Sequence, residues 1–323
     1  MSVLSGINQV SFLNCNMFEA DQPTPSQKIE SEFLKEHGIT LFIKRDDLIH
    51  PDISGNKWRK LKYNFLEARK QKINTILTFG GAYSNHIAAT AAAANKYGFN
   101  CIGIIRGDEL NPYSNETLQK AHEQGMKFHF IPRTDYRNRS EDNFINSLRK
   151  KFGDCYIIPE GGSNILALKG CTEIVNEIDH DFDTVVSAVG SGGTLAGLAC
   201  GLKSNQQALG ICVLKGANYL DESVNTLINQ FSSYNLTNWK INHDHHLGGY
   251  AKYNDHLIKF INQFKSDHGI LLDPVYTGKM IFAIYTLIKD RYFKSDTKII
   301  ALHTGGLQGI KGYNASNNNQ INN

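Results

Sequence analysis

The sequence predicts an α/β fold with two open, twisted, mostly parallel sheets and flanking helices. Short runs rich in β-branched and aromatic residues alternate with helix-like runs through most of the chain. Strand-like runs also end in glycine-rich turns that open a helix, as at 190–197 after 184–189. This alternation is typical of parallel sheets, because a parallel connection needs a crossover helix. A chain of 323 residues exceeds the usual size of one compact domain, so two lobes are expected.

Residue spacing places the elements in order along the chain. Strands are expected at 41–45, 75–79, 101–106, 126–131, 155–158, 184–189, 211–214 and 298–302. Helices are expected from 58 onward and at 84–94, 114–124, 141–151, 165–178, 221–230, 255–265 and 279–289. Residues after Tyr313 are mostly Asn, Gln and Ser. They bury too little apolar surface to order themselves, so a disordered tail is expected over 314–323.

Composition excludes several classes of function. The net charge is only +3, and no long basic block is present, which argues against a nucleic-acid surface. The longest apolar runs are far too short to span a bilayer, so no membrane partner is expected. Residues 1–15 lack a basic segment followed by an apolar run, and the six cysteines are scattered without a C-x-x-C pair. Both features favour a cytoplasmic protein with reduced core thiols.

The strongest local signal is the glycine-rich turn Gly190–Gly197. A strand, a glycine turn and a helix start present several backbone N–H groups to a phosphate. A tight structural connection and a dinucleotide site are the alternatives. A dinucleotide site needs an acidic residue about 20 residues further on, but the next strand ends in Lys215-Gly216. The dinucleotide interpretation, and with it a nicotinamide-dependent oxidoreductase, is therefore disfavoured.

Two other helix starts could carry chemistry. Ser54-Gly55-Asn56-Lys57 precedes a helix, where a lysine is either a solvated charge or, if buried, a nucleophile towards carbonyls. Ser84-Asn85-His86 opens an alanine-rich helix, and Ser84 is an expected N-cap whose free N–H neighbours could hold a carboxylate. The run 243–246 contains three histidines, but contiguous ligands without a closing partner indicate a solvated loop, so no metal is expected.

Five motifs in order resemble one family over roughly residues 30–310. They are Ser54–Lys57, Ser84–His86, Gly190–Thr194, the run 273–279 (D-P-V-Y-T-G-K) and His303-Thr304-Gly305-Gly306. Together they resemble the pyridoxal-phosphate enzymes that include 1-aminocyclopropane-1-carboxylate deaminase and D-cysteine desulfhydrase. The resemblance implies a fold of the tryptophan-synthase-β type, with the cofactor in a cleft between a lobe of residues 58–163 and a lobe formed by 1–57 plus 164–323. It also implies a homodimer.

The resemblance also implies roles for single residues. Lys57 would attach pyridoxal 5'-phosphate covalently, and Asn85 would hydrogen-bond its ring hydroxyl. The phosphate would be held by the loop residues Gly190, Ser191, Gly192, Gly193 and Thr194. Ser84 would meet the substrate carboxylate, and Tyr276 would act as acid or base, with Tyr250 as a second, weaker candidate.

Two positions bear on the reaction. Ring-opening deaminases of this family carry a glutamate after the tyrosine, where this chain has Thr277, and their last motif differs at Thr304. A hydroxyl beside the pyridine nitrogen leaves it without a carboxylate and makes a weaker electron sink. This favours α,β-elimination from a small D-cysteine-like amino acid, giving a 2-oxo acid and ammonia. A ring-opening deaminase and a non-catalytic cofactor-binding protein are the alternatives.

The chain departs from the family pattern at two positions. Tyr83 stands where members carry glutamine, and Ala251 stands where a glycine is expected after Tyr250. Either change could reshape the substrate pocket.

Overall fold

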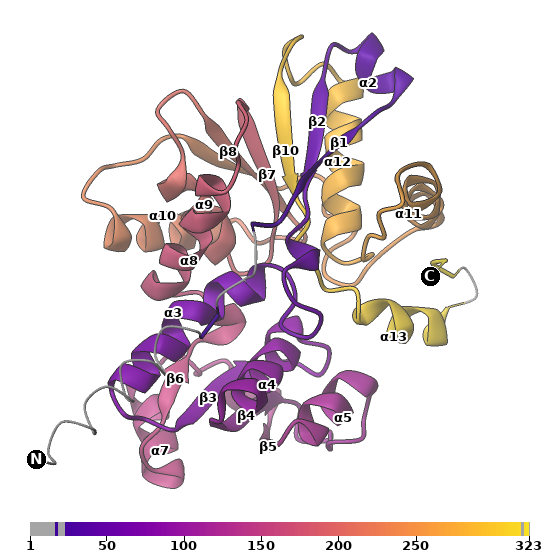
Figure 1. Cartoon of the computed structure of the whole chain (residues 1–323). Coiled ribbons are helices and arrows are strands. Elements are labelled where there is room, and N and C mark those ends of the chain that lie inside the picture. Colours follow the sequence, from indigo (N-terminus) through magenta and orange to yellow (C-terminus); the bar gives the residue numbers. More distant parts are fainter. Residues whose placement is uncertain (1–16, 19–22, 318–319, 323) are drawn as a thin grey trace, which may run out of the picture.

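The computed structural model describes residues 17–18, 23–317 and 320–322, and its strands form two sheets (Figure 1). The larger sheet has the strand order β1-β2-β10-β7-β8-β9. Its strands are β1 (Ser26–Ile29), β2 (Thr40–Lys44), β7 (Thr184–Val189), β8 (Gln207–Cys212), β9 (Trp239–Asn242) and β10 (Lys298–Leu302). Only the β1–β2 pair is antiparallel among the described pairs of this sheet.

The smaller sheet has the order β5-β4-β3-β6, and all its pairs are parallel. Its strands are β3 (Thr75–Gly80), β4 (Asn100–Arg106), β5 (Met126–Ile131) and β6 (Tyr156–Ile158). Together the two sheets confirm the predicted α/β class with mostly parallel strands.

Helices lie against both sheets (Figure 1). They are α2 (Glu32–Glu36), α3 (Asn56–Lys70), α4 (Asn85–Tyr97), α5 (Glu116–Glu123), α6 (Arg133–Tyr136), α7 (Asp142–Phe152), α8 (Ile165–Asn176), α9 (Gly193–Gly201), α10 (Tyr219–Phe231), α11 (Asp255–His268), α12 (Thr277–Lys289) and α13 (Gly309–Ser316), with 3₁₀ turns at Asp46–Leu48 and Glu160–Gly162. None of the described helices has the length and apolar character needed to cross a membrane.

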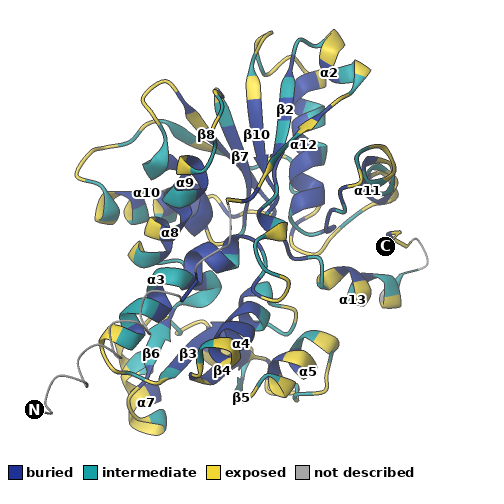
Figure 2. Ribbon diagram, viewed as in Figure 1, coloured by how far each residue is buried: buried dark blue, intermediate teal, exposed yellow. Residues whose placement is uncertain are grey.

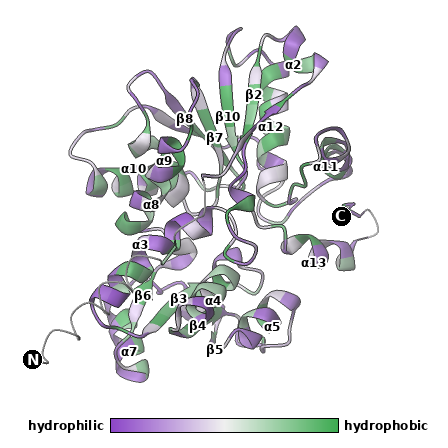
Figure 3. Ribbon diagram, in the orientation of Figure 1, coloured by the Kyte–Doolittle hydropathy of each residue, from purple (hydrophilic) through white to green (hydrophobic). Residues whose placement is uncertain are grey.

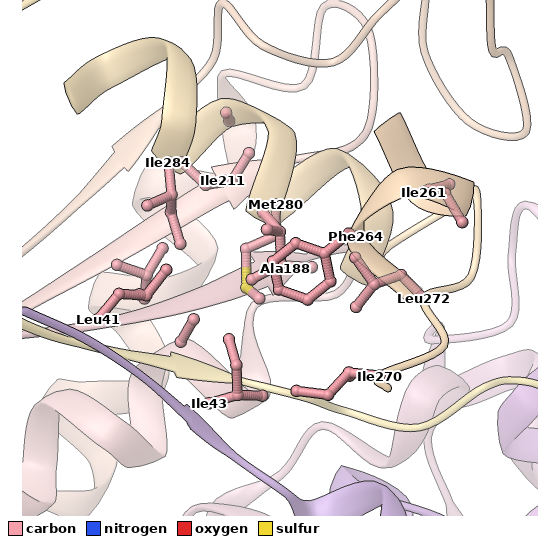
Figure 4. Packing of buried hydrophobic residues seen from close by; sticks show 14 of the residues in the cluster. Leu41, Ile43, Ala188, Ile211, Ile261, Phe264, Ile270, Leu272, Met280 and Ile284 are labelled. Atoms are coloured by element: carbon pink, nitrogen blue, oxygen red, sulfur yellow. The ribbon is translucent and has the colours of Figure 1, made fainter. Parts of the chain in front are cut away.

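The core of the larger sheet lies between its strands and helices α11 and α12. Met280 and Ile284 of α12 pack over strand residues such as Leu41 and Ile43, all of them buried (Figure 4). Burial is greatest in the strands and in α9 and α12 (Figure 2). Hydrophobic residues concentrate in the same elements, whereas loops and outer helices are mainly hydrophilic (Figure 3). This distribution follows from the near-continuous apolar runs that a sheet covered on both faces requires.

Some elements differ from the sequence prediction. The strand expected at 211–214 runs instead over Gln207–Cys212 as β8, because polar residues and Gly210 interrupt its apolar pattern at the start. The short strands β1 and β9 were not predicted, because four-residue segments give too little periodicity to recognise.

The described part of the chain end contradicts the prediction of a disordered tail over 314–323. Helix α13 continues to Ser316, and Ile321 is buried in the core cluster of the larger sheet. The side chain of Asn314 accepts a hydrogen bond from the N–H of Ile321 at 2.8 Å. Burial of Ile321 and its hydrogen bond to Asn314 thus place this residue against the core of the larger sheet.

The predicted lobe boundary also differs at the chain start. Residues 1–57 were assigned to the larger lobe, but Met17 and Phe18 pack in the cluster around the smaller sheet. The Phe18 ring lies 5.0 Å from that of Trp58 and 5.5 Å from that of Phe65, both on α3. These aromatic contacts join residues about 40 positions apart, so a local sequence pattern does not reveal them. The expectation for residues 1–15 lies outside the described residues.

Candidate active site

The loops that carry the predicted motifs follow the carboxyl ends of parallel strands. Strands β7 and β10 are parallel neighbours, so the loops 190–192 and 303–308 leave the larger sheet at the same edge. The loop 81–84 leaves the smaller sheet after β3 in the same way. Ligands of open parallel sheets bind at this edge.

The Ser54–Lys57 turn contacts two other predicted motifs. Gly55 has a φ of 62°, and a Cβ there would overlap the carbonyl of Thr304. The side chain of Asn56 donates a hydrogen bond of 2.8 Å to the hydroxyl of Thr194. Glycine is required at 55 because both the backbone angle and the close approach exclude a side chain.

Lys57 and Lys60 lie at the start of α3 on one side of the helix. The Lys57 amine donates to Asn56 Oδ1 at 3.1 Å, and the Lys60 amine donates to Ser163 Oγ at 2.8 Å. Burial lowers the pKa of Lys57 to about 8. Burial, together with the neighbouring Lys57 charge, lowers the pKa of Lys60 to about 7. Burial therefore shifts both amines towards their neutral forms, which is the state in which a lysine is nucleophilic.

The glycine loop is closed by a second loop, residues 159–164. The hydroxyls of Ser163 and Ser191 lie 2.7 Å apart. A Cβ on Gly193 would lie 2.6 Å from Ser163 Oγ and 3.1 Å from Lys60 Nζ. Gly192 caps α9 with a φ of 80°. The start of α9 thus faces hydroxyls and one amine, which are groups that bind a phosphate.

Asn85 faces the last motif. A Cβ on Gly306 would lie 2.6 Å from Asn85 Nδ2, and the side chain of Gln308 donates to Asn85 Oδ1 at 2.8 Å. Ser84 is the N-cap of α4, as predicted, and its hydroxyl accepts the N–H of Ile87 at 3.3 Å. Within the described residues, the Ser84 side chain makes no hydrogen bond to another predicted site residue.

His86 was not predicted as a site residue. It is buried, its Nε2 lies 2.7 Å from Thr78 Oγ1, and its Nδ1 has no hydrogen-bond partner among the described residues. Burial and the charges of Lys57 and Lys60 hold the pKa of His86 well below its usual value, so the ring is neutral.

Tyr276 and Tyr250 lie together, with ring centroids 6.1 Å apart at 70°. A Cβ on Gly190 would lie 3.2 Å from the Tyr276 ring, which places this tyrosine against the glycine loop. Burial and the neighbouring Tyr250 hydroxyl raise the pKa of Tyr276 well above its usual value. Partial burial also raises the pKa of Tyr250. Both hydroxyls are therefore protonated at neutral pH.

Buried charged groups position both tyrosines. The Asp273 carboxylate accepts the N–H groups of Tyr276 at 2.7 Å and Thr277 at 2.9 Å. The Lys279 amine, fully buried, donates to the carbonyls of His246 at 2.8 Å and Gly249 at 2.6 Å, just before Tyr250. Lys279 was not predicted as a site residue, and the available signal was a lysine in a largely apolar helix.

The two threonines have different surroundings. The Thr277 hydroxyl is buried and donates to Asp273 Oδ2 at 2.7 Å. The Thr304 side chain is half-buried and has no hydrogen bond within the described part of the chain. The Thr304 hydroxyl can therefore hydrogen-bond a ligand, whereas the Thr277 hydroxyl is already bonded within the turn that carries Tyr276.

These features fit pyridoxal phosphate. Neither Lys57 nor Lys60 has a carboxylate partner among the described side chains, and both are drawn towards the neutral state by burial. A phosphate on the glycine loop would supply the missing negative charge beside Lys60. An aldehyde would suit the amine of Lys57.

Comparison with known proteins agrees with this geometry. The profile of the family described as pyridoxal-phosphate dependent enzyme matches residues 17–305. The chain is 33% identical over 315 residues to the bifunctional D-cysteine desulfhydrase/1-aminocyclopropane-1-carboxylate deaminase, mitochondrial, of Arabidopsis thaliana, covering 90% of this chain and 78% of that protein.

Solved structures extend the likeness. The crystal structure of an ACC deaminase homologue superposes with a TM-score of 0.81 at 28% identity, covering 95% of this chain and 97% of that one. The O-acetylserine dependent cystathionine β-synthase of Helicobacter pylori superposes with a TM-score of 0.66 at 16% identity, covering 96% and 98% of the two chains, and it shares the fold. The chain belongs to the pyridoxal-phosphate dependent enzyme family and is homologous to its D-cysteine desulfhydrases and 1-aminocyclopropane-1-carboxylate deaminases.

Proposed function

We propose that this enzyme is a lyase that removes a β-substituent from a small, D-cysteine-like amino acid and releases a 2-oxo acid and ammonia. One observation carries the preference for elimination. The residue after Tyr276 is Thr277, whose hydroxyl is bonded to Asp273, and the hydroxyl of Thr304 is free for the pyridine nitrogen. Because no glutamate occupies position 277, the nitrogen stays largely unprotonated, which suffices when a good leaving group departs.

In this proposal each predicted residue has a defined task. Pyridoxal phosphate supplies an electron sink for the charge that develops at the α-carbon of the substrate. Lys57 attaches the cofactor and moves the α-proton, and its low pKa suits both tasks. Residues 190–194 and Lys60 would hold the phosphate, and Asn85 would hydrogen-bond the ring hydroxyl. These residues are partnered mainly with one another, which supports a preformed binding site.

The substrate side is assigned to the start of α4 and to the tyrosines. Ser84 and the first N–H groups of α4 bind the substrate carboxylate, since a helix N-terminus favours an anion. Tyr276 donates a proton to the departing group, with Tyr250 beside it. The raised pKa of Tyr276 supports this role, because the hydroxyl keeps its proton at neutral pH.

A second candidate is a 1-aminocyclopropane-1-carboxylate deaminase. The Arabidopsis relative carries both activities in its name, and the superposed structure at 28% identity is described as an ACC deaminase homologue. Opening the cyclopropane ring breaks a carbon–carbon bond, which demands a stronger electron sink than thiolate departure. The threonine at 277 therefore favours elimination.

The test is kcat/KM of the purified enzyme for D-cysteine and for 1-aminocyclopropane-1-carboxylate. We expect D-cysteine to be preferred by at least about ten-fold. Thr304→Val, which removes the hydroxyl at nearly constant volume, should reduce kcat/KM for D-cysteine, and Thr304→Ser should restore it. Comparable values, or a preference for the cyclopropane, overturn the proposal. Thr277→Glu is a poor test, because the new carboxylate would be buried beside Asp273.

We also propose that the protein works as a homodimer in the cytoplasm, with a boundary between its two lobes near residues 57 and 163 and with residues 17–18 packed on the smaller lobe. The membership of the two sheets supports the division, since residues 75–158 supply the smaller sheet. Light scattering of the purified enzyme measures its oligomeric state.

A further inference from the structure

A pocket lined by arginines lies in the smaller-sheet half of the molecule. Its cavity measures about 260 Å³, and it is lined by Arg106, Arg133, Tyr136, Arg137, Arg139 and Glu160. The residues come from the end of β4, from α6 and the turn after it, and from the 3₁₀ turn at Glu160–Gly162. None of them was singled out in the sequence.

The charges of this pocket are not balanced. Arg139 is paired with Glu160 at 2.7 Å, and Arg133 with Glu109 at 2.6 Å. Arg106 and Arg137 have no ion pair among the described residues. The pocket thus keeps two uncompensated guanidinium groups, whose flat fork of N–H donors matches a carboxylate or phosphate.

The pocket adjoins the active site on two sides. A Cβ on Gly81 would lie 3.4 Å from Arg106 Nη2, and Gly81 begins the turn that leads to Ser84. On the other side, Glu160 precedes Gly161, where a Cβ would lie 2.6 Å from Ser191 Oγ of the glycine loop. The charges of Arg106 and Glu160 also act on Tyr250, one lowering and the other raising its pKa.

The floor of the pocket is fixed. Tyr136 is buried, and its hydroxyl donates to Glu160 Oε1 at 2.8 Å. The guanidinium carbons of Arg139 and Arg106 lie 5.1 and 5.8 Å from the centre of the Tyr136 ring. The Tyr136 ring thus helps to orient the Arg106 guanidinium, whose N–H groups remain available to bind a ligand.

We infer that this pocket selects amino acids whose side chain ends in an anionic group. The inference rests on the proposed β-elimination and names its substrate class. The ammonium, the carboxylate and the α-carbon would occupy the site between Lys57 and Ser84. The departing group would extend past the tyrosines, and its carboxylate or phosphate would meet Arg106 and Arg137.

For S-carboxymethylcysteine the reaction balances as follows. The α-proton leaves, its electron pair forms the Cα=Cβ bond, and the Cβ–S bond breaks with its pair going to sulfur. The sulfur takes a proton to give mercaptoacetate. The remaining 2-aminoacrylate adds water and yields pyruvate and ammonia, with no oxidant or reductant consumed.

The experiment compares this compound with S-carbamoylmethylcysteine, whose side chain has the same shape but ends in an uncharged amide, each as D and L enantiomers. We expect kcat/KM of the holoenzyme to favour the acid by on the order of ten-fold. Arg106→Gln with Arg137→Gln should bring the ratio close to one. Arg149→Gln with Lys150→Gln removes two exposed positive charges from α7 and is the matched control, which should leave the ratio as it is. O-Phosphoserine against serine, with the same variants, distinguishes a phosphate from a carboxylate.

Calorimetric binding of the same compounds separates this inference from the proposed function. If no amino acid is turned over but S-carboxymethylcysteine binds more tightly than its amide, and the arginine variants abolish the difference, elimination is wrong and the pocket stands. The inference is overturned if the wild type binds and turns over each anionic compound no better than its uncharged counterpart, both for the carboxylate pair and for the phosphate pair. An acid preference that survives in the double variant overturns it equally.

Discussion

Around the glycine loop, polar side chains bond to one another, whereas Tyr250 across the site lies in a loop of unusual backbone geometry. Asn56 is bonded to Thr194, and Ser163 lies against both Lys60 and Ser191. On the other side, Leu247, Gly248, Gly249 and Ala251 around Tyr250 all have positive φ. Tyr250 itself is 43% exposed.

This difference indicates a division of labour. The cofactor is the same in every member of the family, so the groups that hold it can be locked in advance by their neighbours. The substrate varies among members, and its side is carried by loops, which accept changes without loss of the scaffold. Variants on the two sides should therefore fail in different ways.

Lys57→Ala should give the largest effect. We expect turnover to fall by roughly 10³-fold or more, because the residue is asked for covalent and proton-transfer chemistry. The visible absorption band of the bound cofactor should be lost. Folding should be retained, since Lys57 makes no ion pair with any described residue. Lys70→Ala at the exposed end of α3 is the control. Loss of cooperative unfolding in Lys57→Ala would show that Lys57 is structural.

Gly192→Ala tests the locked side. The added Cβ would lie 2.6 Å from Val224 Cγ2 at a φ of 80°. We expect the dissociation constant of pyridoxal phosphate to rise by roughly ten-fold or more, because the loop must shift away from the phosphate. Gly216→Ala is the matched control, with a φ of 68° and open space around the new atom. Equal cofactor affinities of the two variants would contradict the assignment of this loop.

Lys279→Met tests the side of the site that carries the two tyrosines. Two buried carbonyls would lose their donor, at a cost of about 1–3 kcal/mol each, and the loop before Tyr250 would loosen. We expect kcat to fall about ten-fold with the cofactor band intact, and the pH profile of kcat to shift, because a looser loop changes the burial of the tyrosines and the contact between them, which together shift their pKa values. Lys289→Met, at the exposed end of the same helix, should change neither. A variant that loses stability with kcat and its pH profile unaltered would limit Lys279 to packing.

The pH dependence of stability tests the lysine pair. The pKa of Lys60 is near the usual lysine value of 10.5 in the unfolded chain and about 7 in the folded protein. Between these values the unfolded state binds more protons, so the stability of the cofactor-free protein should rise with pH. We expect Lys60→Met to flatten the change in Tm between pH 7 and 9 by on the order of a few degrees. Bound cofactor should also flatten the change in Tm with pH, since its phosphate favours the charged form of the Lys60 amine. Parallel curves for wild type and variant would contradict the lowered pKa.

Local chemistry explains what the sequence could predict. Ser84 as an N-cap and Gly190–Thr194 as a strand-to-helix turn depend on neighbours in the chain, and both are found in the structure. Lys60 was missed because its partner Ser163 is 103 residues away. The spacing of three residues from Lys57, which puts both amines on one side of a helix, was the available signal.

Other features depend on packing that no local pattern encodes. The pocket residues 106 and 133–139 become neighbours only when β4 and β5 pair side by side. The burial of Ile321 likewise required the larger sheet and its helices to be in place. Sequence motifs thus supplied predicted residues for both sides of the site, whereas Lys60 and the arginine pocket were found only in the fold.

Ala251→Gly should give the smallest effect and a stabilising one. Ala251 has a φ of 53° at the position where the family pattern has glycine, and a non-glycine residue in this conformation costs roughly 1–2 kcal/mol. Glycine also loses more conformational freedom on folding, so we expect a net gain of about 0.5 kcal/mol in the free energy of unfolding. Lys72→Gly, at a φ of 59° in the turn after α3, relieves the same backbone strain far from the site. If the Tyr250 loop adapts to substrates, only Ala251→Gly should change KM for β-substituted amino acids, while both variants gain stability. A KM change of the same size in both variants, or none in either, would show that the backbone at 251 has no special influence on the tyrosine side.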